Sequence, residues 1–479
     1  MLYDKDQRYT GFAMPFVLRT ALLFLIALLS LIVTGCRYTS APADLLQKPS
    51  ISKEQQEIIA ALQKAMPKYS VLMLPFRDDS KEAIRLIDVN GDGEEEAVVT
   101  YYNEFNIPEL LILKKSGDSW KPWVVIEQPT ARGMEWLKFV DLNNDGHLEL
   151  LVGWVGSFES PNTLELYSFQ TKGERNQKGS MSIKPIEAIP YSYAETGMLG
   201  DNGETMLAVV TEQGSKQLEE SSSYQLVLYE WKGGTIRPKA RLALNNTVNN
   251  YDHMLIGNIS EQQKGIVVEG SYGAHGTYTT MLLWDGSTLD IIYPNERLGQ
   301  DGISGTTVFS EDFNGDGIVE LQIKKETPDS KGLPYSDTSF TTYWQQWNGK
   351  HFVTKGEQLL DYSYGYKLDI PDSWRGRYTW EYGSNEYEAA VFYYWNEQSE
   401  QKSELATLYA IPQKIWSTHD QEWKEEGRNY RTVMIDSGNV YAISFVSSIP
   451  PQLQQIDRQI VEEMLKVEIN FSSYISALD

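Results

Sequence analysis

The stretch DLNNDGHLE, residues 141–149, contains a spacing of polar residues that recurs twice more in the chain. The pattern D-x-N-x-D-G-x-x-E is also found at residues 88–96 (DVNGDGEEE) and 312–320 (DFNGDGIVE). In chain order the copies are called loop 1 (residues 88–96), loop 2 (residues 141–149) and loop 3 (residues 312–320). Each loop has oxygen-bearing side chains at positions 1, 3, 5 and 9 and glycine at position 6.

This arrangement of oxygen atoms predicts that the loops bind calcium. Ca²⁺ takes about six to eight oxygen ligands, and the first half of an EF-hand loop uses the same spacing, with a main-chain carbonyl at position 7. Glycine at position 6 permits the sharp turn because it adopts positive φ at no steric cost. The predicted ligands are Asp88, Asn90, Asp92, Glu94 (carbonyl) and Glu96 in loop 1; Asp141, Asn143, Asp145, His147 (carbonyl) and Glu149 in loop 2; and Asp312, Asn314, Asp316, Ile318 (carbonyl) and Glu320 in loop 3.

The sequence around the loops does not fit an EF-hand. An EF-hand loop ends with a bidentate Glu at position 12, where this chain has Val99, Val152 and Ile323. Short runs rich in Val, Ile and Leu flank each loop, including residues 307–309 before loop 3, and such runs predict strands. We therefore expect a calcium-clasped connection between two strands. The alternative is an ordinary Asp-Gly hairpin turn without metal.

The loops belong to a longer repeat. Loops 1 and 2 begin 53 residues apart, and loops 2 and 3 begin 171 residues apart, which is three intervals of 57. Two degenerate copies are predicted in between, near residues 198 and 255, where a strand–loop–strand pattern is kept but the ligands are missing. We expect these copies to bind no calcium tightly. About four strands per repeat are typical of a propeller blade, so residues 68–358 predict five blades, with residues 70–75 completing the last one.

The three loops between strands resemble FG-GAP or VCBS repeats, the calcium-bearing blades of the integrin α-chain type of propeller. The resemblance covers the repeat region and implies that calcium is a structural metal at the loop residues. Integrin heads have seven blades, so the five units found here are a departure from the family. The resemblance implies no particular ligand, because propellers carry many functions.

The remaining carboxyl-terminal sequence has no repeat. Its opening, YGYKLDIPDSW at residues 364–374, is similar to the start of PsbP-like α/β domains. Strands are expected at residues 388–395, 405–411, 430–435 and 440–446, followed by an amphipathic helix over about residues 451–465.

The amino end resembles that of a bacterial lipoprotein. Residues 21–33 are apolar apart from Ser30 and are too short to span a bilayer. They lead into Val33-Thr34-Gly35-Cys36, which is similar to a lipobox, in which Cys36 would receive a lipid after cleavage. The alternative is an ordinary secretory signal. Because Cys36 is the single cysteine of the chain, no intramolecular disulfide can form. The expected location is extracytoplasmic, anchored through this lipid to the bacterial cell membrane.

These observations predict a mainly β protein in which a β-propeller of about five four-stranded blades precedes a small α/β domain. A length of 479 residues is consistent with several domains. The predicted divisions are 1–35, signal peptide; 36–52, tether; 53–67, helix with a Ser52–Gln55 capping box; 68–358, propeller; and 359–479, α/β domain.

The net charge and the motifs missing from the sequence argue against several classes of function. A formal net charge of −24 disfavours nucleic acid, whose phosphates need Lys and Arg. None of the five histidines occurs at a zinc-binding spacing, and P-loop and G-x-S-x-G motifs are missing from the sequence. We therefore predict a binding or scaffold module for a surface protein or wall glycan. A polysaccharide-active enzyme with paired carboxylates and a purely structural spacer are the alternatives.

A set of aromatic residues lies after the calcium loops. These residues end the strands that leave the loops. Their position predicts an aromatic face opposite the metals, where the rings could stack on a sugar or a partner peptide. The alternative is that they are core residues between blades. The set comprises Tyr101, Tyr102, Trp154 and Tyr272.

Overall fold

The computed structural model describes residues 52–77, 82–157, 160–170, 174–175, 180–200, 203–213, 223–361, 363–449, 453, 455–466 and 469–473. The predicted signal peptide, Cys36 and the tether as far as residue 51 lie outside these residues. No helix among the described residues is long and apolar enough to cross a membrane. The chain divides into two compact units, one of Met1–Met66 with Ser116–Lys121 and one of Pro67–Lys115 with Pro122–Asp479.

The smaller unit contains helix α3 (Lys53–Ala65), whose start is fixed by the predicted capping box. The Ser52 hydroxyl accepts the Gln55 backbone N–H at 3.1 Å, and the Gln55 side chain accepts the Ser52 N–H at 3.0 Å. This reciprocal pair satisfies two donors that the first turn of a helix leaves without partners. Ile58 and Leu62 are the buried residues of the helix.

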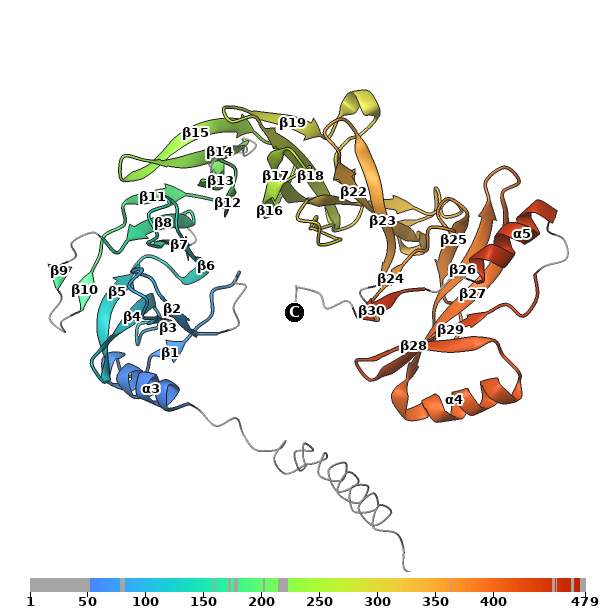
Figure 1. Cartoon of the computed structure of the whole chain (residues 1–479), viewed down its shortest axis with the longest axis horizontal. Helices are drawn as coiled ribbons and strands as arrows, with labels where there is room; N and C mark the ends of the chain where they lie inside the picture. Colours follow the sequence, from blue (N-terminus) through green and yellow to red (C-terminus); the bar gives the residue numbers. More distant parts are fainter. Residues whose placement is uncertain are drawn as a thin grey trace, which may run out of the picture. The chain divides into compact units, whose positions relative to one another are not determined.

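Strands dominate the rest of the described chain and form six sheets, coloured in chain order in Figure 1. Sheet A contains β1 (Val71–Leu72), β2 (Ile84–Ile87), β3 (Glu96–Tyr102), β4 (Pro108–Ser116), β5 (Ser119–Glu127), β9 (Glu174–Arg175) and β10 (Met181–Ser182). Sheet B contains β6 (Gly133–Val140), β7 (Glu149–Val155), β8 (Thr163–Ser168) and β11 (Glu187–Pro190). Sheet C contains β12 (Tyr193–Met198), β13 (Thr205–Gln213), β14 (Ser223–Lys232) and β15 (Thr235–Ala243).

The remaining sheets follow in the same order. Sheet D contains β16 (Asn250–Asn258), β17 (Lys264–Tyr272), β18 (Gly276–Trp284), β19 (Leu289–Tyr293) and β20 (Ile303–Ser304). Sheet E contains β21 (Glu320–Glu326), β22 (Phe340–Trp347), β23 (Phe352–Asp361), β24 (Tyr366–Asp369) and β30 (Phe471–Ser473). Sheet F contains β25 (Tyr378–Tyr382), β26 (Glu388–Asn396), β27 (Gln401–Pro412), β28 (Tyr430–Asp436) and β29 (Asn439–Phe445). Short 3-10 turns η1 (Glu296–Leu298) and η2 (Tyr335–Asp337) lie in connections.

The repeat is visible as antiparallel strand–loop–strand units. Loop 1 joins β2 to β3, loop 2 joins β6 to β7, and the degenerate copies join β12 to β13 and β16 to β17, as predicted. The strand expected at residues 307–309 is not formed. The Phe309 N–H instead donates to the Gln322 side chain at 2.6 Å, and two isolated bridges, Glu311 to Glu320 and Asn258 to Ile318, lie at the start of β21.

Two predicted boundaries are wrong. Within residues 70–75, β1 pairs with β3 of sheet A and does not complete the last repeat. The predicted division after residue 358 falls inside β23, and β23 continues to pair with β24, which pairs with β30 near the carboxyl end. Sheet E therefore combines strands from the repeat and from the predicted α/β region.

The predicted strands of the carboxyl-terminal region are found as β26 to β29, and the predicted amphipathic helix is α5 (Gln455–Met464). Helix α4 (Gln413–Glu425), between β27 and β28, was not predicted. Trp374 is fully buried, and its indole N–H donates to the Met464 carbonyl at 3.0 Å. This bond anchors the end of α5 to the core of the region.

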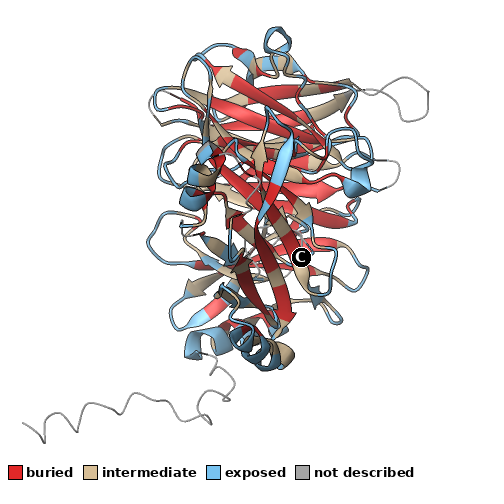
Figure 2. Ribbon diagram, turned by 90° about the vertical axis from the view of Figure 1, so that its right-hand side faces the viewer, coloured by how far each residue is buried: buried red, intermediate tan, exposed pale blue. Residues whose placement is uncertain are grey.

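The buried residues lie mainly along the strands, while the connecting loops are largely exposed (Figure 2). Strands β3 and β7, which leave loops 1 and 2, are buried along almost their whole length. These strands hold one end of each loop rigidly, so the geometry of the loops is set by the sheets behind them.

Candidate metal centre

All three loops share two hydrogen bonds at their first acidic residue. The position-1 carboxylate accepts the backbone N–H groups of positions 5 and 6. For Asp88 these donors are Asp92 at 3.2 Å and Gly93 at 2.8 Å; the same two bonds form at Asp141 and at Asp312. The position-5 carboxylate in turn accepts the N–H of position 7, at 2.9 to 3.0 Å. The polar side chains therefore fold each loop around its own acidic oxygens.

The position-9 glutamate closes each loop from the buried side. Glu96, Glu149 and Glu320 are each at most 1% exposed. One oxygen accepts the N–H of position 2 at 2.9 to 3.1 Å, and the other accepts the side-chain amide of the position-3 asparagine. This residue therefore holds the loop shape as well as being a predicted ligand.

Burial of these glutamates has an electrostatic consequence. Burial raises the pKa of Glu149 and of Glu320 to about 7, because it disfavours the charged form, although the bonded backbone N–H lowers it. Burial also raises the pKa of Glu96, where the Val89 N–H and the Lys114 ammonium oppose it. A cation at loops 2 and 3 would favour the ionised glutamate.

Glycine at position 6 has the left-handed backbone that the sequence predicts, with φ of 84° at Gly93, 85° at Gly146 and 82° at Gly317. Position 4 is also left-handed, a feature that sequence reasoning missed. It is occupied by Gly91, Asn144 and Gly315, with φ between 58° and 73°. The residues at position 4 could have indicated this conformation, because Gly and Asn are the residues that best tolerate positive φ.

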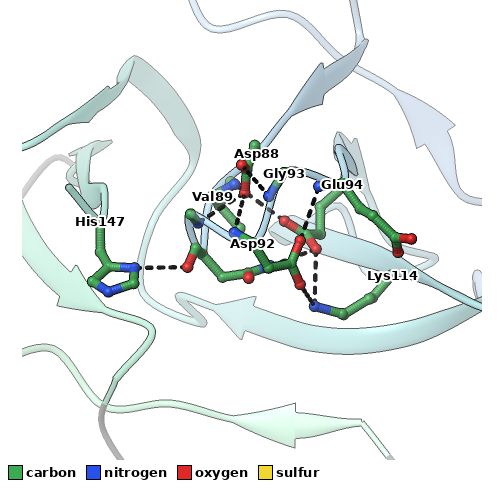
Figure 3. Close-up of polar contacts among 10 residues, drawn as sticks. Asp88, Val89, Asp92, Gly93, Glu94, Lys114 and His147 are labelled. Carbon is green, nitrogen blue, oxygen red and sulfur yellow. Dashed lines mark hydrogen bonds and ion pairs between the residues drawn. The ribbon is translucent and has the colours of Figure 1, made fainter.

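The second oxygen of each position-5 aspartate faces a side chain from a neighbouring strand or its end. In loop 1 the Lys114 ammonium lies 2.6 Å from Asp92 Oδ2 and 3.3 Å from Glu96 Oε1 (Figure 3). In loop 2 Gln170 donates to Asp145 at 3.1 Å, and in loop 3 Gln346 donates to Asp316 at 2.9 Å. Sequence reasoning did not identify these partners, because they lie more than 20 residues from the aspartates that they contact.

Loops 1 and 2 lie side by side. The His147 imidazole is hydrogen-bonded through Nδ1 to the Asn90 carbonyl at 2.6 Å (Figure 3). The carbonyl can only accept, so Nδ1 carries the proton in this contact. His147 thus links two repeats through its side chain, in addition to the carbonyl role predicted for it.

The donor set of the loops fits a hard cation. Each carboxylate oxygen has two lone pairs, so an oxygen that accepts one N–H can still contact a metal. The groups that would hold Ca²⁺ are the carboxylates of positions 1, 5 and 9, the position-3 amide oxygen and the position-7 carbonyl, all of them oxygen atoms. In the described part of the chain, no three acidic or histidine side chains form a ready metal cluster.

Comparison with protein families agrees with this geometry for the first two loops. A family model described as an FG-GAP-like repeat matches residues 88–152. Residues 88–152 contain an FG-GAP-like repeat. The comparison of the chain with curated proteins found no match.

The FG-GAP-like repeat begins at position 1 of loop 1 and ends within β7, so it contains both loop 1 and loop 2. Loop 3 lies outside the matched residues. It nevertheless repeats the hydrogen bonds of the FG-GAP-like repeat at positions 1, 5 and 9. The local structure therefore extends the pattern beyond the matched segment.

The degenerate copies have the same place between strands but different chemistry. In the copy between β16 and β17, the turn is closed by the Ile259 N–H and the Gln263 carbonyl at 2.9 Å. Asn258 of this copy donates to the Gly317 carbonyl of loop 3 at 3.2 Å. In this copy, main-chain and amide groups therefore replace the carboxylates found in the FG-GAP-like repeat.

The predicted aromatic face is only partly present. Tyr101 and Trp154 are 2% and 1% exposed, so their rings are core residues and cannot stack on a ligand. Each donates to a buried carboxylate: the Tyr101 hydroxyl to Glu109, and the Trp154 indole to Glu165 at 2.7 Å. The alternating side chains of a strand explain this result, because the neighbour Tyr102 is partly exposed. Tyr272 is also partly exposed.

One buried cluster brings together residue types found in catalytic sites. Glu269 is fully buried and accepts hydrogen bonds from Thr279 at 3.0 Å, the Ser310 hydroxyl at 2.7 Å and His253 Nδ1 at 2.7 Å. The hydroxyl and the imidazole both contact the carboxylate, so the serine is not paired with a histidine base. This arrangement fits a structural network that satisfies a buried charge.

Proposed function

We propose that this chain is a lipid-anchored, calcium-binding repeat protein on the outer side of a bacterial cell membrane. In this proposal the successive sheets A to E are blades of a β-propeller that acts as a binding or scaffold module for a surface protein or a wall glycan. The lipobox-like sequence ending at Cys36 supports the anchor. The FG-GAP-like repeat at residues 88–152 supports the propeller.

One observation carries the calcium part of the proposal. The same all-oxygen loop, with the same internal hydrogen bonds, recurs between or before strands at residues 88–96, 141–149 and 312–320. An ordinary Asp-Gly turn needs only two central residues. The same nine-residue spacing of acidic residues occurs in three separate places, which is more than such a turn requires. A hard cation accounts for the full pattern.

Calorimetric titration of the full chain in detergent with Ca²⁺ tests the proposal. We expect heat of binding and a higher melting temperature, because a ligand that binds only the folded state adds about 2.7 kcal/mol at a hundredfold excess over Kd. Mg²⁺ is the matched control, since it prefers a smaller, near-octahedral site. Absence of both heat and a thermal shift with Ca²⁺ would overturn the calcium assignment.

The binding role is supported by the way rigid strands present exposed residues at their ends. Tyr102 ends β3 and Tyr272 ends β17, and both remain partly exposed. Retention of the protein on purified wall glycan, compared with retention of a Tyr102→Ala, Tyr272→Ala variant, tests the glycan form of the proposal. Equal retention of both proteins would contradict a role for these rings.

A further inference from the structure

The three loops differ in one respect that their sequence pattern does not contain. Each position-5 aspartate has an outer oxygen that faces a side chain from elsewhere in the chain. In loops 2 and 3 that side chain is a neutral amide, Gln170 or Gln346. In loop 1 it is the ammonium group of Lys114.

Lys114 and Gln346 occupy matching places in their sheets. Glu320 at position 9 of loop 3 is paired across the sheet with Gln346. In sheet A, Ala97 is paired with Leu113 in antiparallel strands. Glu96 precedes Ala97 and Lys114 follows Leu113, so Lys114 lies beside Glu96 as Gln346 lies beside Glu320. The two side chains also make the same two contacts, to the carboxylates of positions 5 and 9. Loop 1 therefore has a cation where loop 3 has an amide.

The position of the ammonium matters for metal binding. Lys114 Nζ lies between two of the predicted calcium ligands, at 2.6 Å from Asp92 and 3.3 Å from the buried Glu96. It also lies 5.4 Å from the centre of the Trp123 ring, a favourable cation–π distance. A second cation in the loop would be repelled by the ammonium and would compete with it for the same oxygens, which is costly in a partly buried site.

We propose that Lys114 is the resident cation of loop 1, so that loop 1 is stable without metal and Ca²⁺ binds at loops 2 and 3 only. The inference rests on the proposed calcium function and assigns Lys114 as the residue that distinguishes the loops. The amides of Gln170 and Gln346 carry no net charge, and an amide can turn its oxygen toward a cation. Loop 1 then serves as a metal-free support for loop 2, to which it is tied through His147 and Asn90.

The experiment compares Ca²⁺ stoichiometry in three full-length proteins by titration calorimetry. The unaltered chain is expected to bind two ions. Lys114→Gln gives loop 1 the residue of loop 3 and is expected to bind three ions. Gln346→Lys, the matched reverse exchange, is expected to bind one ion in the concentration range where the unaltered chain binds two, because repulsion between cations weakens Ca²⁺ binding at loop 3 by at least about tenfold.

Near-ultraviolet circular dichroism in a chelator shows whether each variant is folded. If Lys114→Gln does not fold, loss of one ion in Gln346→Lys still supports the inference. Three ions in the unaltered chain, or unchanged stoichiometry in both folded variants, would overturn the inference and leave the calcium function in place. No binding by the unaltered chain would overturn the calcium function and, with it, this inference.

Discussion

Replacing Gly91 by alanine should destabilise the protein more than the same replacement at Gly315. Both glycines occupy position 4 of their loops, with φ of 70° and 73°. An L residue in this left-handed region costs about 1–2 kcal/mol. The surroundings of the two glycines differ, so a comparison of the two variants separates the cost of backbone strain from the cost of steric conflict.

An alanine Cβ at position 91 would lie 2.9 Å from His147 Nδ1 and 3.0 Å from the Gly146 carbonyl, whereas at position 315 nothing lies within 4 Å. To relieve the conflict at position 91, His147 must move and lose its hydrogen bond to Asn90, which is worth about 0.5–1.5 kcal/mol. We therefore expect Gly315→Ala to cost about 1–2 kcal/mol from strain. Gly91→Ala should cost about 1.5–3.5 kcal/mol from strain plus the lost bond.

The assay is urea unfolding followed by tryptophan fluorescence, in a chelator so that bound metal does not contribute. His147→Ala provides the control, because removing the imidazole removes both the bond and part of the conflict. In that background Gly91→Ala should cost about 1 kcal/mol less than in the unaltered chain, as expected for residues in contact. Equal destabilisation by Gly91→Ala and Gly315→Ala would refute the account of loops 1 and 2 as packed neighbours.

Three further predictions concern other parts of the chain. Trp154→Phe should lower the unfolding free energy by about 1–3 kcal/mol in urea unfolding, because Glu165 loses a buried donor; an unchanged value would contradict the core role of the indole. Burial lowers the pKa of Lys324 to about 8, so the unfolded state binds more protons between pH 8 and 10.5 and stability should rise with pH there. Lys324→Met should accordingly raise the unfolding free energy at pH 7 by at most about 3 kcal/mol in urea unfolding, and this difference from the unaltered chain should shrink toward pH 10.5. A difference in unfolding free energy that does not vary with pH would argue against burial of Lys324. Cys36→Ala should abolish incorporation of labelled fatty acid in bacteria, and continued labelling would show that the lipid is elsewhere.

Much of the local structure could be predicted from sequence because it is determined by residues close together in the chain. The capping box of α3 needs only Ser52 and Gln55. The positive φ at position 6 of each loop follows from glycine in an Asp-Gly turn. The strands on both sides of loops 1 and 2 follow from short apolar runs, which have few alternatives to pairing with each other.

The remaining features depend on contacts between distant segments. Whether a ring at the end of a strand faces the core or the solvent depends on the register of that strand, and this places Tyr101 inside and Tyr102 at the surface. The strand expected at residues 307–309 is lost because its backbone donates to side chains of other strands. The sequence alone determined the nine-residue acidic loops, since their hydrogen bonds join residues a few positions apart. Only the tertiary structure decided that a lysine reaches one loop and amides reach the others, because strand pairing brings residue 114 to residues 92 and 96 and residue 346 to residues 316 and 320.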